Sequence, residues 1–183
     1  MYIASQKKKE NIAEYILYMW QIEDLVRTCR FDMETIQEQI ISRFGLEEEK
    51  KKQMTEWYES IVDMMTTEQI REKGHLQMVR NTLNEAEEIH KALLYSMRHP
   101  DYTSCYYKTL PQIAELRARE QTSQAGDLEV CLNFLYGILI LRLQKKEISK
   151  QTQDSQQQIA RFMSLLSEKY RLYKEDQLDL AID

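Results

Sequence analysis

The sequence has 183 residues, of which 43% are hydrophobic and 30% are charged, with only four glycines and two prolines. This length fits one domain that buries roughly 70% of the surface of its unfolded chain, and this composition favours long helices over a turn-rich β architecture. The net charge of −5 gives no general attraction to a phosphate backbone or an anionic membrane, so we expect neither nucleic acid nor a membrane as a partner.

The N-terminal third of the chain predicts three helices. The first, at about residues 9–29, carries two apolar stripes a third of a turn apart, so most of its surface should be enclosed by protein. The second begins after Asp32, a plausible N-cap, and ends at Gly45. The third begins with the acidic residues 47–49, which suit the positive end of a helix dipole, and ends before Gly74.

The middle of the chain predicts a fourth helix from His75 to Met97, whose regular apolar seam includes His90. A break follows at residues 98–101, because the residue before Pro100 is disfavoured in a helix. Residues 109–112 resemble a capping box with Pro111 in the first turn, so we expect a helix to restart there; one helix kinked at the proline is the alternative. A polar loop from Glu120 to Gly126 follows.

The next segment, at about residues 128–147 and capped by Asp127, predicts the central helix of the fold. Twelve of the sixteen residues from Leu128 to Leu143 are apolar, and they fall on every side of a helix, so the helix should be surrounded by protein. Its uncharged stretch is only about 18 Å long, against roughly 30 Å of bilayer hydrocarbon, so it cannot span a membrane. The cost of Gly137 in mid-helix predicts close approach of a crossing helix, with approach of a ligand as the alternative.

A final helix follows the turn around Ser149, and residues 175–183 are expected to be a frayed tail. The predicted fold is therefore an all-α, single-domain bundle of about seven helices over residues 1–174, with the helices at 9–29 and 128–147 in its centre. The three cysteines are far apart and show no metal-binding spacing, so we interpret them as reduced core residues. No signal peptide is recognisable, and we expect a cytoplasmic protein.

Charged residues on enclosed helices are the main candidates for a site, because a buried charge normally has a partner. One interpretation is a structural ion pair that joins the two central helices. The other is a pocket in which an arginine binds an anionic ligand and tyrosine hydroxyls add contacts. The candidate residues are Glu23, Asp24, Tyr106, Tyr107, Arg117 and Arg142.

Glu87 and His90 form a weaker candidate for a metal site. Their E-x-x-H spacing places both side chains on one helical face, as in the di-iron proteins that use this unit twice. The other match, Glu72 with His75, straddles Gly74, where a helix should end, so the unit does not recur on a helix. We therefore expect no metal and no cofactor, and the glycine-rich and nucleophile motifs of enzymes are missing from the sequence.

Four segments of the sequence resemble a family of uncharacterised bacterial helical proteins that carries only a domain-of-unknown-function label. The segments are KENIAEYILYMWQIEDLVR at Lys9–Arg27, EKGHLQ at Glu72–Gln77, YYKTLPQIAELRA at Tyr106–Ala118 and LYGILILRLQKKEIS at Leu135–Ser149. The resemblance covers nearly the whole chain and implies one domain. It implies no reaction, substrate or cofactor.

Two classes of function remain open from the sequence. The simpler is a soluble, non-enzymatic helical interaction or structural protein, for instance a twofold homodimer that uses surplus apolar surface on the first or the central helix. The alternative is a binding protein or enzyme for a small anionic molecule that uses the acid, arginine and tyrosine cluster. A concave, hydrated cluster would favour the second class, and a dry, fully paired cluster the first.

Overall fold

The computed structural model describes residues 2–96, 98–120 and 125–180 and confirms an all-helical, single-domain fold. These residues form eight α-helices and one short 3-10 helix, with no β-strand among them. The helices are α1 (Tyr2–Glu10), α2 (Ile12–Thr28), α3 (Met33–Gln39), η1 (Ile41–Phe44), α4 (Glu48–Thr67), α5 (Gln77–Tyr95), α6 (Pro100–Glu120), α7 (Asp127–Leu143) and α8 (Lys150–Lys174). In the same residues, no helix combines the length and apolarity that crossing a membrane requires.

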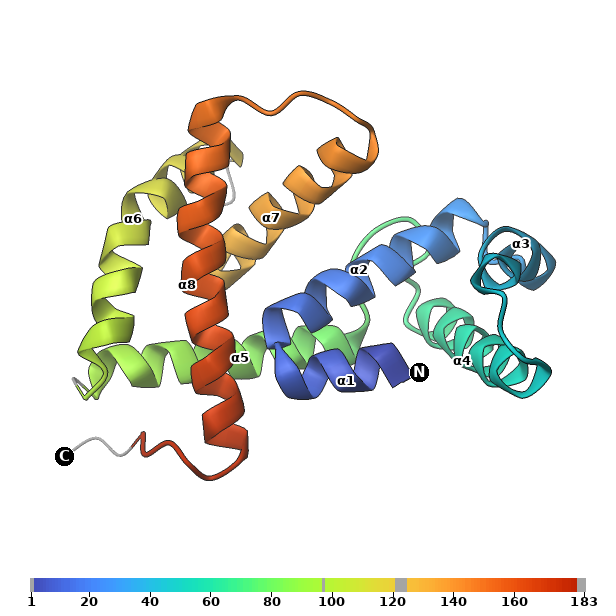
Figure 1. Ribbon diagram of the computed structural model, residues 1–183, viewed down its shortest axis with the longest axis horizontal. Coiled ribbons are helices and arrows are strands. Elements are labelled where there is room, and N and C mark those ends of the chain that lie inside the picture. Colours follow the sequence, from blue (N-terminus) through green and yellow to red (C-terminus); the bar gives the residue numbers. More distant parts are fainter. Residues whose placement is uncertain (1, 97, 121–124, 181–183) are drawn as a thin grey trace.

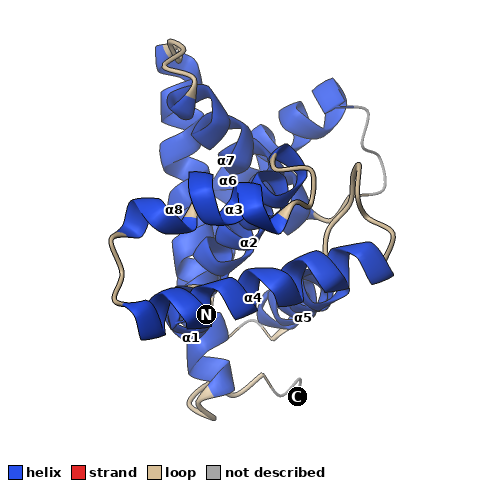
Figure 2. Ribbon diagram, turned by 90° about the vertical axis from the view of Figure 1, so that its right-hand side faces the viewer, coloured by secondary structure: helices blue, strands red, loops and turns tan. Residues whose placement is uncertain are grey.

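The long helix α8 lies across the bundle, and α1, α2, α5, α6 and α7 all pack against it. Figure 1 shows α6 and α7 on either side of α8, with α5 running across its lower half. The helices α3, η1 and α4 gather at the other end of the molecule, beside the C-terminal half of α2 (Figure 2). The centre of the fold is therefore shared by α2, α7 and α8.

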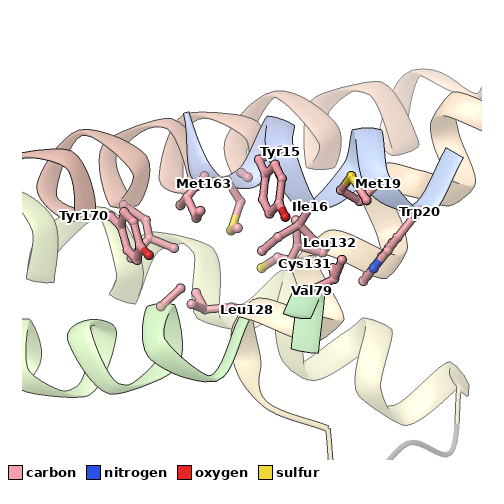
Figure 3. Packing of buried hydrophobic residues seen from close by; sticks show 14 of the residues in the cluster. Tyr15, Ile16, Met19, Trp20, Val79, Leu128, Cys131, Leu132, Met163 and Tyr170 are labelled. Carbon is pink, nitrogen blue, oxygen red and sulfur yellow. The ribbon is translucent and has the colours of Figure 1, made fainter. Parts of the chain in front are cut away.

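A continuous apolar core joins α2, α5, α7 and α8. Figure 3 shows Met19 and Trp20 of α2 facing Leu132 of α7, with Val79 of α5 and Met163 of α8 closing the cluster. All five side chains are at most 3% exposed. Burying this apolar surface supplies the main favourable free energy of the fold.

The helix ends agree with several sequence expectations and correct others. Asp32 is the N-cap of α3, since its carboxylate accepts a hydrogen bond from the Thr35 amide, and Gly45 ends η1 with a left-handed φ of 56°. The predicted helix at residues 9–29 corresponds to α2, and a separate helix α1 precedes it, since Asn11 ends α1 and caps α2 by accepting from the Glu14 amide. The predicted central helix stops at Leu143, four residues early.

The expected restart of a helix at Thr109 is wrong, because α6 runs without interruption from Pro100 to Glu120 with Pro111 inside it. The Thr109 hydroxyl does not cap a new helix; it donates to the Cys105 carbonyl, 2.8 Å away, within the same helix. It also accepts from the side-chain Nε2 atom of Gln158 on α8 at 2.9 Å. Packing against α8 thus holds α6 together across the proline.

The segment after α8 makes contacts that the sequence pattern does not indicate. Leu178 and Leu180 are half-buried against the core, and Asp179 forms an ion pair with Arg98 at 2.9 Å. The predicted tail also includes residues 181–183, and the predicted loop after α6 includes residues 121–124; both stretches lie outside the described residues.

Candidate functional site

The C-terminal half of α7 is only partly covered by the rest of the chain. Leu128, Cys131 and Leu132 in its first half are fully buried, whereas Leu143 is 67% exposed. Among the described residues, the continuous core follows α7 as far as Tyr136, and the half-buried Leu139, Ile140 and Leu141 lie outside it. The prediction that α7 is enclosed along its whole length is therefore wrong.

Gly137 lies on the open side of α7. A Cβ built on this residue would meet no described atom within 4 Å, so the predicted crossing helix does not exist within the described chain. Residues three and four positions away share its face of the helix. Phe134, three positions before Gly137, packs against the core. We call the remainder of this face the outer strip; it consists of Asn133, Gly137, Ile140 and Leu141.

The opposite side of α7 lines a groove of about 550 Å³ between α2, α7 and α8. Its walls are mainly apolar, with polar groups at both ends. The lining residues are Lys7, Asn11, Ala13, Glu14, Leu17, Tyr18, Gln21, Leu135, Ile138, Leu139, Arg142, Gln156, Ala160, Met163 and Ser164. We call this hollow the α2–α7 groove.

Arg142 lies exposed at one end of the groove, away from the acidic residues of α2 with which the sequence suggested a pair. Its Nη2 atom donates to the Oε1 atom of Gln156 on α8 at 2.7 Å. The structure thus does not bring Arg142 together with Glu23 or Asp24.

Glu23 is fully buried and acts as a cap for a different helix. Its Oε1 atom accepts from the Leu76 amide at the start of α5, at 2.9 Å, and its Oε2 atom lies 2.7 Å from Nδ1 of His75. The His75 ring stacks on Trp20, with ring centroids 4.4 Å apart. These contacts supply the cap that α5 lacks in its own sequence, since Leu76 stands at its N-cap position.

Asp24 links α2 to α7 and to the connection between α4 and α5. Its carboxylate accepts from the Tyr136 hydroxyl at 2.5 Å and from Arg27 at 2.9 Å. Arg27 in turn donates to the carbonyls of Ile70 and Gly74. Burial and the Asp24 carboxylate raise the pKa of Tyr136, so the hydroxyl remains a donor at neutral pH. The Asp24 carboxylate and both terminal nitrogens of Arg27 thus have structural partners within the chain, whereas Nε of Arg27 is buried without one.

Tyr106 and Arg117 do converge, on the first residue of α7. The Tyr106 hydroxyl donates to Oδ2 of Asp127 at 2.6 Å, and Arg117 donates to Oδ1 at 2.5 Å. Burial, followed by the hydrogen bond to Asp127, raises the pKa of Tyr106. Tyr107 is 61% exposed and contacts the Tyr106 ring, with ring centroids 5.4 Å apart, but no hydrogen bond joins it to Asp127 in the described structure. The six candidate residues therefore lie in several separate places.

The hollow beside Asp127, about 660 Å³, is poorly suited to an anion. Its lining includes Glu87, Glu88, Asp127 and Glu129, four carboxylates, against the cations Lys91 and Arg117. Because Arg117 is already paired with Asp127, an anionic ligand would have to replace that carboxylate. The charges and pairing of this hollow therefore disfavour an anionic ligand.

Glu87 and His90 lie on one face of α5, as their spacing predicts, but have separate structural partners. Glu87 accepts from the Leu128 amide at 2.9 Å and so caps α7, which has Gly126 at its N-cap position in place of the predicted Asp127. A Cβ on Gly126 would lie 2.2 Å from the Glu87 carboxylate, which explains the glycine. Burial raises the pKa of Glu87.

His90 is buried, and its Nδ1 atom lies 2.6 Å from the Tyr102 hydroxyl. Burial lowers its pKa to about 4, so the ring is neutral at physiological pH. In the described part of the chain, no three His, Cys, Asp or Glu side chains are grouped so that they could hold a metal ion. The E-x-x-H spacing here serves helix capping and core packing.

A family model matches residues 1–177, nearly the whole chain, and its description is Domain of unknown function (DUF4924). The chain belongs to this family. Membership in DUF4924 confirms the resemblance in the sequence and brings no activity with it. No curated protein and no solved structure matches the chain.

The sequence alone does not locate the outer strip or the α2–α7 groove. Its signal for both is a helix that is apolar on all sides and contains a central glycine. That pattern predicts an enclosed helix, with surplus apolar surface for a homodimer and close approach of a ligand as the alternatives, and the structure leaves the last turns of the helix partly uncovered by the described chain.

Proposed function

We propose that this protein is a helical interaction protein that assembles as a twofold homodimer through the outer strip of α7. The observation that carries the proposal is the exposure of Gly137 in the middle of an apolar helix. Ile140 and Leu141 of the same strip are only half-buried, and apolar surface that a globular protein leaves uncovered marks sites of association.

The glycine itself supports a helix as the covering element. In a helix interior glycine costs about 0.5–1 kcal/mol relative to alanine, and in the open surroundings of Gly137 nothing in the described chain offsets that cost. The distance between two packed helices depends on the side chains at their contact, so a glycine at the crossing point allows close approach. Ile140 and Leu141 would then pack on the partner helix.

Charge favours an antiparallel pair of α7 helices. Glu129 precedes Gly137 by eight residues, and Lys145 and Lys146 follow it by eight and nine. An antiparallel pair that crosses at Gly137 brings the acidic start of each helix near the basic end of the other, and the helix dipoles are also opposed. A twofold axis at Gly137 generates this arrangement with the same surface on both subunits.

The proposed location is the cytoplasm, and the cysteines support it. Cys29, Cys105 and Cys131 are all buried as free thiols. Burial raises the pKa of all three, most strongly that of Cys131, so they are poor nucleophiles and behave as small apolar core residues. Free core thiols fit a reducing compartment.

Native mass spectrometry and light scattering after size exclusion test the assembly. The wild-type chain should have the mass of a dimer, and Gly137→Leu should have the mass of a monomer, because a side chain at the crossing point separates the helices. Ala114→Leu, on the exposed face of α6, is the matched control and should remain dimeric. A wild-type chain that stays monomeric at all concentrations, or a Gly137→Leu variant that dimerises like the wild type, would contradict the proposal.

A further inference from the structure

The α2–α7 groove has the dimensions of a small-molecule site. Its volume of about 550 Å³ falls within the range of roughly 300–1,000 Å³ that is usual for ligand pockets. Leu17 and Tyr18 of α2 and Leu135 and Leu139 of α7 form its walls, and Met163 of α8 lies between them. Apolar walls on three helices suit the chain of an amphiphilic molecule better than a sugar or a nucleotide.

The length of the groove limits the length of that chain. Along α8 the lining residues run from Gln156 to Ser164, a separation of eight positions, or about 12 Å at 1.5 Å per residue. An extended zigzag of carbon–carbon bonds of about 1.5 Å covers this distance with about ten carbons. The groove is thus matched to a medium-length alkyl chain.

The two ends of the groove differ in charge. At one end Lys7 is paired with Glu14, 2.6 Å away, so the two charges offset each other. At the other end the Arg142 guanidinium is exposed and, in the described chain, is bonded to the neutral amide of Gln156 rather than to a carboxylate. Arg142 therefore has donors free for an anionic group, and a guanidinium binds a carboxylate with two parallel hydrogen bonds.

We infer that the α2–α7 groove binds a medium-chain fatty acid, with its alkyl chain along Leu135 and Leu139 and its carboxylate on Arg142. This site lies on the opposite side of α7 from the outer strip, so it does not depend on the proposed homodimer. The proposed protein would thus bind a small ligand as well as a second copy of itself, and Arg142, one of the candidate residues from the sequence, would bind the carboxylate.

The test measures binding of decanoate to the full chain by isothermal titration calorimetry. Decanoate should bind more tightly than hexanoate, which fills only part of the groove, and more tightly than decyltrimethylammonium, which has the same chain and the opposite charge. Arg142→Gln should weaken decanoate binding at least tenfold, since one charge-assisted pair is lost, and Arg142→Lys should recover part of that loss. Neither change should weaken binding of the cationic amphiphile.

A second variant tests the location. Ala160 is exposed on α8 and lines the groove, so Ala160→Phe should fill it and remove binding of both amphiphiles. Ala114→Phe, on the exposed face of α6, is the matched control and should bind decanoate like the wild type. Urea unfolding of each variant confirms that it is folded before binding is measured.

Several results would overturn the inference. The first is no binding of decanoate, and the second is equal affinity of decanoate for the wild type and Arg142→Gln. The third is a change in subunit number on Ala160→Phe, which would show that a second copy of the chain occupies the groove. Retained decanoate binding by monomeric Gly137→Leu supports the inference, because it separates the groove from the outer strip.

Discussion

Replacing Gly137 with alanine should stabilise the isolated subunit. The added methyl group meets no described atom within 4 Å, so no steric cost opposes the gain in helix propensity, which is about 0.5–1 kcal/mol. A chain of 150–250 residues gains about 2–4 °C in Tm for each kcal/mol, so the Tm should rise by about 1–4 °C. This sign is the reverse of what a glycine packed beneath a crossing helix would give.

Urea unfolding monitored by circular dichroism, at a concentration where light scattering finds a monomer, measures this effect. Ala114→Gly on the exposed face of α6 provides the matched control, because it should lose a similar amount of free energy. At higher protein concentration the dimer forms, and its stability increases with concentration by mass action. Under those conditions the difference in free energy of unfolding between Gly137→Ala and the wild type should shrink, since the methyl group separates the two α7 helices.

A lower free energy of unfolding for monomeric Gly137→Ala would refute the reasoning. It would mean that something covers the outer strip within one subunit. If Gly137→Ala raises the free energy of unfolding by the same amount at all concentrations, the outer strip is open in one subunit, but the two α7 helices do not cross at Gly137 in the dimer.

Three further predictions concern buried polar groups. Glu23→Ala should cost about 2–4 kcal/mol in urea unfolding, because the buried Leu76 amide loses its acceptor, whereas Glu23→Gln keeps an acceptor and should cost less. The pKa of His90 is about 4 in the folded chain against 6.5 in the unfolded chain, so roughly 3 kcal/mol of stability, present above pH 6.5, should be lost as the pH falls to 4. NMR titration of the ring should give the low pKa. The variant His90→Gln should show a flatter dependence of the free energy of unfolding on pH in this range. Burial raises the pKa of Glu87, so the folded state binds its proton more tightly than the unfolded state does. The free energy of unfolding of the wild type, relative to that of Glu87→Gln, should therefore rise from neutral to mildly acidic pH. Urea unfolding of both proteins at the two pH values measures this change.

Local sequence signals predicted much of the fold. The N-cap at Asp32, the stop at Gly45 and the break before Pro100 depend on the backbone preferences of single residues, which act within a few positions of the chain. Pro111 shows the limit of such signals. Its missing amide favours a helix start, but contacts of α6 with α8, including the bond from Gln158 to Thr109, outweigh that local preference.

The candidate site was harder to predict because its residues depend on which helices meet. Arg142 and Glu23 were candidates for a pair on the assumption that both central helices are enclosed along their whole length. In the folded chain, Glu23 instead accepts a hydrogen bond at the start of α5, and Arg142 lies at one end of the α2–α7 groove, bonded to Gln156. Hydrophobic periodicity identifies an apolar face, but it does not state whether that face is covered by the same chain, a second copy or a ligand.

The two helix caps supplied from a distance affect how the protein opens. Glu23 of α2 holds the first turn of α5, and Glu87 of α5 holds the first turn of α7, over sequence separations of 53 and 41 residues. The Leu76 and Leu128 amides have these acceptors only while α2 is docked on α5 and α5 is docked on α7, so fraying should not begin independently at these two ends. Hydrogen exchange at the amides of Leu76 and Leu128 should therefore follow the large-scale opening of the bundle rather than local fluctuation, and α2, α5 and α7 should open and close as one cooperative unit.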